Sequence, residues 1–250
     1  MTFLRESSIV FRRQLRMNLR NPAWVIIGML QPVLYLLLFG PLLKDVVKTF
    51  GYDNAYTFFV PGLLVQLGIF GAFFAGFSLI GEWREGVIEA ERVTPASRTA
   101  LLMGRLWRDL TQLLVQAIIL VALGYLMGMR ASWQGAVLGV VLTLLIGGAC
   151  AASSNALALT TKSEDVMAPV INMVMMPVLL LSGILLPMTI GPKWLLDVSD
   201  VMPTRHVVDA VRGLFTGGAG SELAWGTGWA IVLCALGVWW GTATFRRENA

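Results

Sequence analysis

Long apolar stretches alternate with short polar ones along the whole chain. Six stretches approach or exceed the ~20 residues that a helix needs to cross a bilayer. None of them contains Asp, Glu, Lys, Arg or His: residues 24–43, 58–81, 110–128, 135–160, 166–187 and 223–244. The pattern predicts an all-α membrane protein with six transmembrane helices in one domain, residues 1–250. The composition agrees, since 56% of the residues are hydrophobic and only 14% are charged.

The positively charged residues predict the orientation, because Lys and Arg gather in the short loops on the cytoplasmic side. Placing the N-terminus inside puts most of the 19 Lys and Arg residues there. Both termini are then cytoplasmic. Residues 82–105 form a cytoplasmic segment between the second and third spans, and residues 188–222 form an extracellular segment before the sixth.

The first 22 residues predict a helix that lies on the membrane surface. At ~100° per residue, five arginines fall on one arc and apolar side chains cover most of the rest: Arg5, Arg12, Arg13, Arg16 and Arg20. Such a helix places its apolar face at the acyl boundary and its arginines toward anionic headgroups. Asn21-Pro22 is expected to end it, since the residue before proline avoids helical geometry.

Residues 82–105 concentrate charge in an otherwise apolar chain. Within residues 82–93, Trp83, Val87 and Ala90 share one helical face and the charged residues share another, which predicts one short amphipathic helix. Thr94-Pro95 should end that helix, and a second one should run from near Pro95 into the third span. A solvated linker is the alternative, but the tryptophan and the mixed charge favour a docking surface for another protein.

Residues 188–222 contain two short amphipathic pieces, "PKWLLDVSDVMP" and "TRHVVDAVRGLFTG". Thr204 is the expected N-cap of the second piece. Its apolar residues form one face, while Arg205, Asp209 and Arg212 point elsewhere. We expect this piece to lie at or dip into the outer interface, as a moving gate or as a static cap. The candidate gate residues are Trp194, Val207, Val208, Val211 and Phe215.

A few polar side chains among apolar walls are typical of small-molecule sites. In the second span, phenylalanines recur at helical spacing one turn after Gln66, and two other spans each carry a polar amide. The candidate residues of a substrate path are Gln31, Gln66, Phe70, Phe73, Phe74 and Asn172. Ordinary packing between helices or against lipid is the alternative for the phenylalanine stripe.

Several classes of function lack the residues that they need. Proton-coupled transporters generally use intramembrane carboxylates or histidines, which these spans do not contain. The chain has no G-x-x-x-x-G-K-[ST] phosphate-binding loop and no cluster of catalytic groups, so we expect it not to be an enzyme. Its two cysteines, Cys150 and Cys234, fall within spans, and neither a metal site nor a cofactor site is expected. No nucleic-acid partner is expected.

Two stretches at matching places in the chain carry a family resemblance: "GEWREGVIEAERVTPASRTALLMGRLW" and "LSGILLPMTIGPKWLLDVSDVMPTRHVVDAVRGLF". With the amphipathic N-terminal helix and six spans, they resemble the permease subunits of type two ABC exporters, close to the daunorubicin-resistance branch. The resemblance implies a homodimer, or a pair with a paralogous half-permease, in a bacterial plasma membrane. It also implies two separate ATP-binding-cassette subunits that carry the ATP and magnesium.

The same resemblance implies a coupling helix seated in each ATPase subunit. It maps onto Glu82, Trp83, Arg84, Glu85, Val87, Glu89, Glu91 and Arg92. It further implies that the first and fifth spans of opposing subunits meet around the transport path. The expected function is outward movement of an apolar or amphipathic substrate such as a drug, antibiotic or lipid-like molecule. Export of a polysaccharide or glycolipid, and a channel or membrane-organising protein without an ATPase, are the alternatives.

Overall fold

The computed structural model describes residues 3–20, 23–49, 54–93, 97–185, 188, 191–218 and 220–248. These residues form helices and no strand. The helices are α1 (Phe3–Arg20), α2 (Ala23–Leu42), α3 (Val46–Thr49), α4 (Ala55–Phe73), α5 (Ala75–Arg84), α6 (Val87–Arg92), α7 (Arg98–Leu126), α8 (Trp133–Thr161), α9 (Glu164–Leu181), α10 (Lys193–Asp200), α11 (Pro203–Thr216) and α12 (Ser221–Glu248). The expected helix ends at Asn21-Pro22 and Thr94-Pro95 fall outside the described residues.

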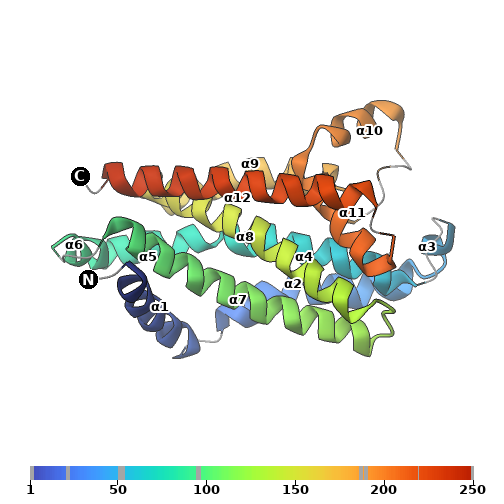
Figure 1. Ribbon diagram of the computed structural model, residues 1–250, viewed down its shortest axis with the longest axis horizontal. Coiled ribbons are helices and arrows are strands. Elements are labelled where there is room, and N and C mark those ends of the chain that lie inside the picture. Colours follow the sequence, from blue (N-terminus) through green and yellow to red (C-terminus); the bar gives the residue numbers. More distant parts are fainter. Residues whose placement is uncertain are drawn as a thin grey trace.

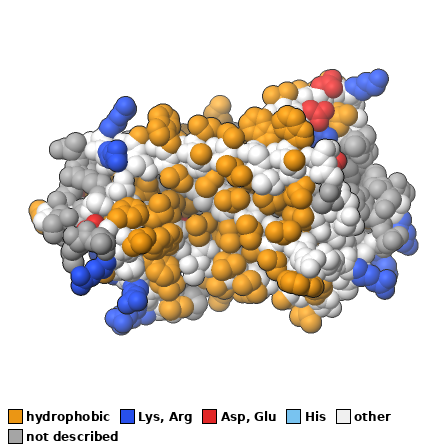
Figure 2. Space-filling model, in the orientation of Figure 1, with side chains coloured by type: hydrophobic (Ala, Val, Ile, Leu, Met, Phe, Trp, Pro, Cys, Tyr) orange, Lys and Arg blue, Asp and Glu red, His pale blue; other side chains and the backbone are white. Residues whose placement is uncertain are grey.

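Six helical segments of the described chain are long and apolar enough to cross a membrane, which confirms the predicted number of spans. They lie side by side in one bundle, and both ends of the chain lie at the end that carries α6 (Figure 1). Hydrophobic side chains form a broad band across the middle of the molecule, while Lys and Arg gather at its two ends (Figure 2). This distribution is what a bilayer requires of a protein that spans it.

The second span, predicted as residues 58–81, consists of two helices that meet at Phe74. The backbone N–H of Phe77 donates to the carbonyl of Phe74, at 3.2 Å, so the regular ladder is interrupted there. Ser154 of α8 fills the gap, since its hydroxyl accepts from the Gly76 N–H at 3.1 Å and donates to the Phe73 carbonyl. A break inside a membrane helix persists when a neighbouring side chain satisfies the freed backbone groups.

Glycines bring several helices into close contact within the chain. A Cβ added at Gly237 would lie 2.5 Å from the carbonyl oxygen of Ala149, and one added at Gly139 would lie 2.6 Å from the ring of Phe215. The first of these contacts joins α12 to α8, and the second joins α8 to α11. Small residues therefore allow the backbones of neighbouring membrane helices to approach one another here.

Helix α11 packs against α12, α4 and α8 at the end of the bundle opposite to both termini (Figure 1). Its apolar face is covered by these helices, and its position at the outer interface stays a prediction. Four of its apolar side chains are buried: Val207, Val208, Val211 and Phe215. Thr204 is not the N-cap either, because the helix begins at Pro203, and the Thr204 hydroxyl instead lies 2.7 Å from that of Ser182.

Arg212 was expected to point away from the apolar face of α11, but it is 6% exposed. Its guanidinium donates to the carbonyl of Gly183 at 2.9 Å and lies over the ring of Phe58, 4.2 Å from the centroid. These contacts offset the cost of burying a charge. Arg212 thereby holds α11 to the end of α9 and to α4.

Candidate functional site

The charged segment after the second span contains a sharp turn. Helix α5 ends at Arg84, Gly86 adopts the left-handed conformation with φ 75°, and α6 begins at Val87. Glycine is favoured at such a helix end because it has no Cβ to clash with the backbone. The prediction of one continuous amphipathic helix over residues 82–93 is therefore wrong. Trp83 and Val87 lie on two different helices.

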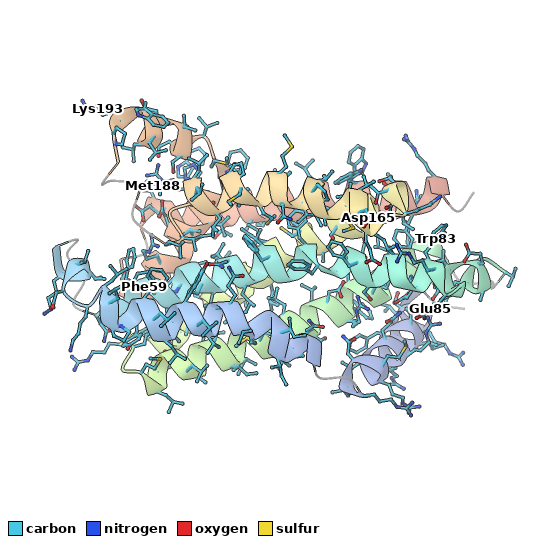
Figure 3. The ribbon with its side chains drawn as sticks, turned by 180° about the vertical axis from the view of Figure 1, so that it is seen from behind. Phe59, Trp83, Glu85, Asp165, Met188 and Lys193 are labelled. Atoms are coloured by element: carbon cyan, nitrogen blue, oxygen red, sulfur yellow. The ribbon has the colours of Figure 1, made fainter. Side chains whose placement is uncertain are left out.

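The outer surface of this turn carries charge of both signs. Arg84, Glu85 and Glu89 are exposed, and Arg84 forms a 3.0 Å ion pair with Glu164 at the start of α9. Trp83 and Val87 are half-buried, while the side chain of Arg92 lies outside the described part of the chain. Figure 3 shows Trp83, Glu85 and Asp165 at the same end of the bundle. This end therefore presents an exposed charged turn.

Glu82 and Glu91 point inward, although the sequence pattern placed them with the docking residues. Both carboxylates bind the guanidinium of Arg105, at 2.7 Å and 2.8 Å. The Arg105 side chain is 1% exposed, and those of Glu82 and Glu91 are 8% and 9% exposed. A single arginine of α7 thus fixes both α5 and α6. The signal in the sequence was an isolated arginine in the otherwise apolar run "TALLMGRLW".

The N-terminal helix is joined to the same group of charges. Arg13 forms a 3.1 Å ion pair with Glu91, and Gln14 donates to Glu82 at 2.7 Å. Val10 packs where a Cβ on Gly104 would collide with it, so α1 lies tightly on α7. We refer to Arg13, Gln14, Glu82, Glu91, Arg105, Arg108 and Asp109 together as the ion-pair cluster.

Two residues of α7 complete the ion-pair cluster. Arg108 donates to Asp109 at 2.6 Å, to Ser78 at 3.0 Å and to the side-chain oxygen of Gln14 at 3.2 Å. The predicted third span began at residue 110 because these charges were taken as the end of the apolar region. The helix predicted to run from near Pro95 into this span is confirmed as α7, which begins at Arg98. Its charged side chains pair with one another and so remain inside the protein.

The geometry of the ion-pair cluster makes this end of the molecule stiff. Hydrogen bonds between charged groups are short and directional, and a buried pair becomes strongly destabilising once one partner is removed. Helix α6 has only six residues, too few to be stable alone. Its position therefore depends on Arg105 and Arg13, so that a force on α6 reaches α1, α5 and α7 together.

The candidate path residues do not converge on one cavity within a single chain. Gln66 is enclosed, 1% exposed, and neither atom of its amide has a hydrogen-bond partner among the described residues. Phe70 is half-buried and Phe74 is exposed. Gln31 on α2 and Asn172 on α9 are exposed on the outside of the bundle. These six residues could form one path only if a second chain or a movement brought them together.

Phe73 alone among the candidates lines the groove between α4, α8, α9 and α12, whose volume is about 410 Å³. Its walls are almost entirely apolar and include Cys150, Ser153, Trp239 and Trp240. The Ser153 hydroxyl already donates to the Ala149 carbonyl at 2.9 Å. The sequence reasoning missed this groove, because its residues come from five distant segments with no shared pattern, the fifth being α11 through Thr204.

Comparison with known proteins identifies the class to which this arrangement belongs. The ABC-2 type transporter family matches residues 5–216, most of the chain. The chain belongs to the ABC-2 type transporter family. It is 29% identical over 217 residues to a daunorubicin resistance ABC transporter permease of Streptomyces coeruleorubidus, which covers 85% of this chain and 74% of that one.

Other relatives lie at similar distances. A putative transport permease of Cyanophora paradoxa is 26% identical over 218 residues, which cover 86% of this chain and 75% of that one. A probable doxorubicin resistance ABC transporter permease of Mycobacterium tuberculosis is 23% identical over 219 residues, covering 86% and 79%. The chain is accordingly a multi-pass permease subunit of an ABC transporter, and it is not itself an enzyme.

Proposed function

We propose that this permease exports an apolar or amphipathic substrate with energy from ATP hydrolysed, with magnesium, on two separate ATP-binding-cassette subunits. Those subunits dock on the exposed turn formed by Arg84, Glu85, Val87 and Glu89. The observation that carries the proposal is the ion-pair cluster, which attaches α6 to α7 and α1, and α5 to the same arginine of α7, at the end of the bundle. The orientation predicted from the positively charged residues would put this turn in the cytoplasm, where ATP is available.

The rigid attachment of α6 supports coupling between ATP hydrolysis and movement of the spans. A partner bound to α6 can move the bundle only if α6 is firmly attached to the other helices. Helix α6 is attached to α7 by Glu91–Arg105 and to α1 by Arg13. Helix α5 is attached to α7 by Glu82–Arg105 and continues into α4 across the break at Phe74. Displacement of α6 would therefore tilt α5, the half of the second span that adjoins the exposed turn, before it tilts α4.

Two features of the spans support the substrate class. The charged side chains of the ion-pair cluster pair with one another, and the groove between α4, α8, α9 and α12 has almost no polar lining. Gln66 supplies an enclosed amide that no protein group satisfies among the described residues. An apolar molecule matches the walls of the groove, and a polar group on it would match the Gln66 amide, which lies outside that groove. The relatives named for daunorubicin and doxorubicin resistance agree with such a substrate.

The outer faces of α2 and α9 support assembly as a homodimer in a bacterial plasma membrane. Large apolar side chains are exposed along both helices, including Ile27 and Leu38 on α2 and Met173 and Met176 on α9. These helices lie on either side of α4 in the view from behind (Figure 3). A second copy, or a paralogous half-permease, placed against this face would bring Gln31 and Asn172 toward the centre of the assembly.

The extracellular gate is proposed to consist of α10 and α11. Helix α11 closes the outer part of the bundle with Val207, Val208, Val211 and Phe215, while Trp194 on α10 is 66% exposed. The contact of Arg212 with Gly183 ties α11 to the end of α9. Opening would require this contact to break, so that α9 and α11 separate at the outer end.

Reversing charge on the exposed turn tests the docking surface. We expect Glu85→Lys combined with Glu89→Lys to leave the permease inserted and folded, because both side chains are exposed. Binding of the ATPase subunit should fall about tenfold or more, since charge complementarity at the interface is lost. The measurement is co-purification of the ATP-binding-cassette subunit and substrate-stimulated ATP hydrolysis in vesicles.

The matched control reverses two exposed carboxylates at the opposite end of the bundle, Asp45→Lys with Glu222→Lys. It changes the net charge equally and should leave ATPase binding intact. Unchanged ATPase binding and hydrolysis in the Glu85/Glu89 variant would refute docking at this turn.

A further inference from the structure

The ion-pair cluster links α6 to α1, an N-terminal helix with exposed arginines. We propose that α1 binds the headgroups of anionic phospholipids and that this contact sets the stability of α6 through Arg13 and Gln14. The lipid composition of the membrane would then tune the segment on which the ATPase is proposed to dock. Only that last consequence rests on the proposed function.

Helix α1 has three sides, where the sequence pattern predicted two. One side is buried against α7 and the loop before it, and consists of Glu6, Ser7, Val10 and Gln14. Glu6 accepts a hydrogen bond from the backbone N–H of Ser97 at 2.9 Å. A helix that lay on the membrane alone would not bury a carboxylate and an amide. Helix α1 is therefore held by the protein on one side only.

The other two sides face outward and match a lipid surface. Leu4 and Leu19 are 66% and 74% exposed along one edge. Arg5, Arg12, Arg16 and Arg20 are exposed along the other. An apolar edge beside a basic edge is the arrangement with which an interfacial helix enters the acyl boundary and attracts anionic headgroups. Because the acidic residue of this helix, Glu6, is buried, its exposed charge is wholly positive.

The route from α1 to α6 is short. Arg13 stands next to the basic edge, half-exposed at 46%, and its guanidinium lies 3.1 Å from Glu91 of α6. One residue further, Gln14 donates to Glu82 and accepts from Arg108. Holding α1 against the headgroups therefore restrains the groups that hold α6. A six-residue helix gains its stability from such contacts, so its local opening should become rarer.

Hydrogen exchange of the purified permease in lipid nanodiscs measures this link directly. Discs of zwitterionic phospholipid are compared with discs that also contain an anionic phospholipid. We expect anionic lipid to slow amide exchange in both α1 and α6 by about threefold or more. High salt should reduce the effect, because it screens exposed charges. No ATPase subunit is present, so a failure here is distinct from a failure of the proposed function.

Two variants separate binding from transmission. Arg12→Gln with Arg16→Gln removes exposed charge from α1, and anionic lipid should then slow exchange in neither helix. Glu91→Gln keeps the arginines of α1 but weakens the link to α6, so anionic lipid should slow exchange in α1 and not in α6. The matched control is Arg246→Gln with Arg247→Gln, two exposed arginines at the same end of the bundle that should leave the response intact.

Three results would overturn the proposal. The first is α6 exchange that is equal in both kinds of disc in the wild-type permease. The second is loss of the response in the Arg246/Arg247 control, which would show a general charge effect. The third is an equal slowing by inorganic phosphate added to zwitterionic discs, which would assign the arginines to a soluble anion.

Discussion

Replacing Arg105 with methionine should lower the free energy of unfolding of the permease by about 3–5 kcal/mol. The substitution leaves Glu82 and Glu91 buried without the cation that both of them bind. Methionine fills a similar space, so the effect reports the lost charge more than a cavity. We expect α6 to detach first, because it has only six residues. The measurement is thermal or denaturant unfolding of the purified permease in detergent.

The control for this prediction is Arg84→Met, which breaks an ion pair with Glu164 whose side chains are 53% and 44% exposed. An exposed pair contributes only about 0–1 kcal/mol, so this variant should unfold close to the wild type. Restoring neutrality with Arg105→Met, Glu82→Gln and Glu91→Gln together should recover part of the loss. Equal stability of Arg105→Met and Arg84→Met would show that the ion-pair cluster does not hold the fold.

Replacing Gln66 with leucine should change stability and transport in opposite directions. The amide of Gln66 is 1% exposed and has no hydrogen-bond partner among the described residues. A buried polar group left unsatisfied costs about 1–3 kcal/mol, which leucine of similar size would recover. If Gln66 serves the substrate, the apparent affinity for that substrate should fall up to about tenfold, the value of one hydrogen bond.

Gln116 on α7 is the matched control, since its buried amide donates to the Val25 carbonyl of α2 at 3.3 Å. Gln116→Leu should lower the unfolding free energy, because the hydrogen bond between α7 and α2 is lost. Unfolding in detergent and transport into vesicles are measured for both variants. Lower stability in Gln66→Leu, or unchanged transport, would remove Gln66 from the path and assign it to packing.

The spans could be predicted because a bilayer imposes a minimum apolar length on every crossing helix. That rule is local, so it needs no knowledge of neighbours. It does not predict where charged side chains stay inside the protein because they pair with residues from elsewhere in the chain. Arg105 marked the end of the apolar region by composition, yet it belongs to the interior because Glu82 and Glu91 reach it.

The burial of Arg212 on helix α11 could not be predicted from the sequence, for the same reason. Its pattern of Val207 and Val211 opposite Arg205 and Asp209 is that of a surface helix. Arg212 is buried with Gly183 and Phe58 beside it in the fold and Asp209 one turn earlier, 3.6 Å away. The interruption of the helix at Gly86 could not be predicted from the sequence either. A glycine within a charged helical pattern does not by itself indicate a left-handed backbone.

The exposed charge of the turn between α5 and α6 could be predicted from the sequence, because mixed charge is costly anywhere but in water or against a partner. Glu85 and Glu89 are exposed as this reasoning expects. The division between outward and inward carboxylates could not be found, since Glu89 and Glu91 differ only in which side of a six-residue helix faces Arg105. Docking itself stays a prediction until a partner is seen on the turn.

Crosslinking at Glu89 tests the central claim most directly. A cysteine is placed there in a background where Cys150 and Cys234 are replaced by serine, and a second variant carries it at Asp45, at the opposite end of the bundle. Membranes containing the permease and its ATP-binding-cassette subunit are treated with a short reagent that carries one thiol-reactive group and one photoreactive group, illuminated, and the products are identified by mass spectrometry. The account predicts a crosslink to the ATP-binding subunit from position 89 and none from position 45. A crosslink from position 45 alone, or none from position 89 while the two proteins co-purify, would contradict it.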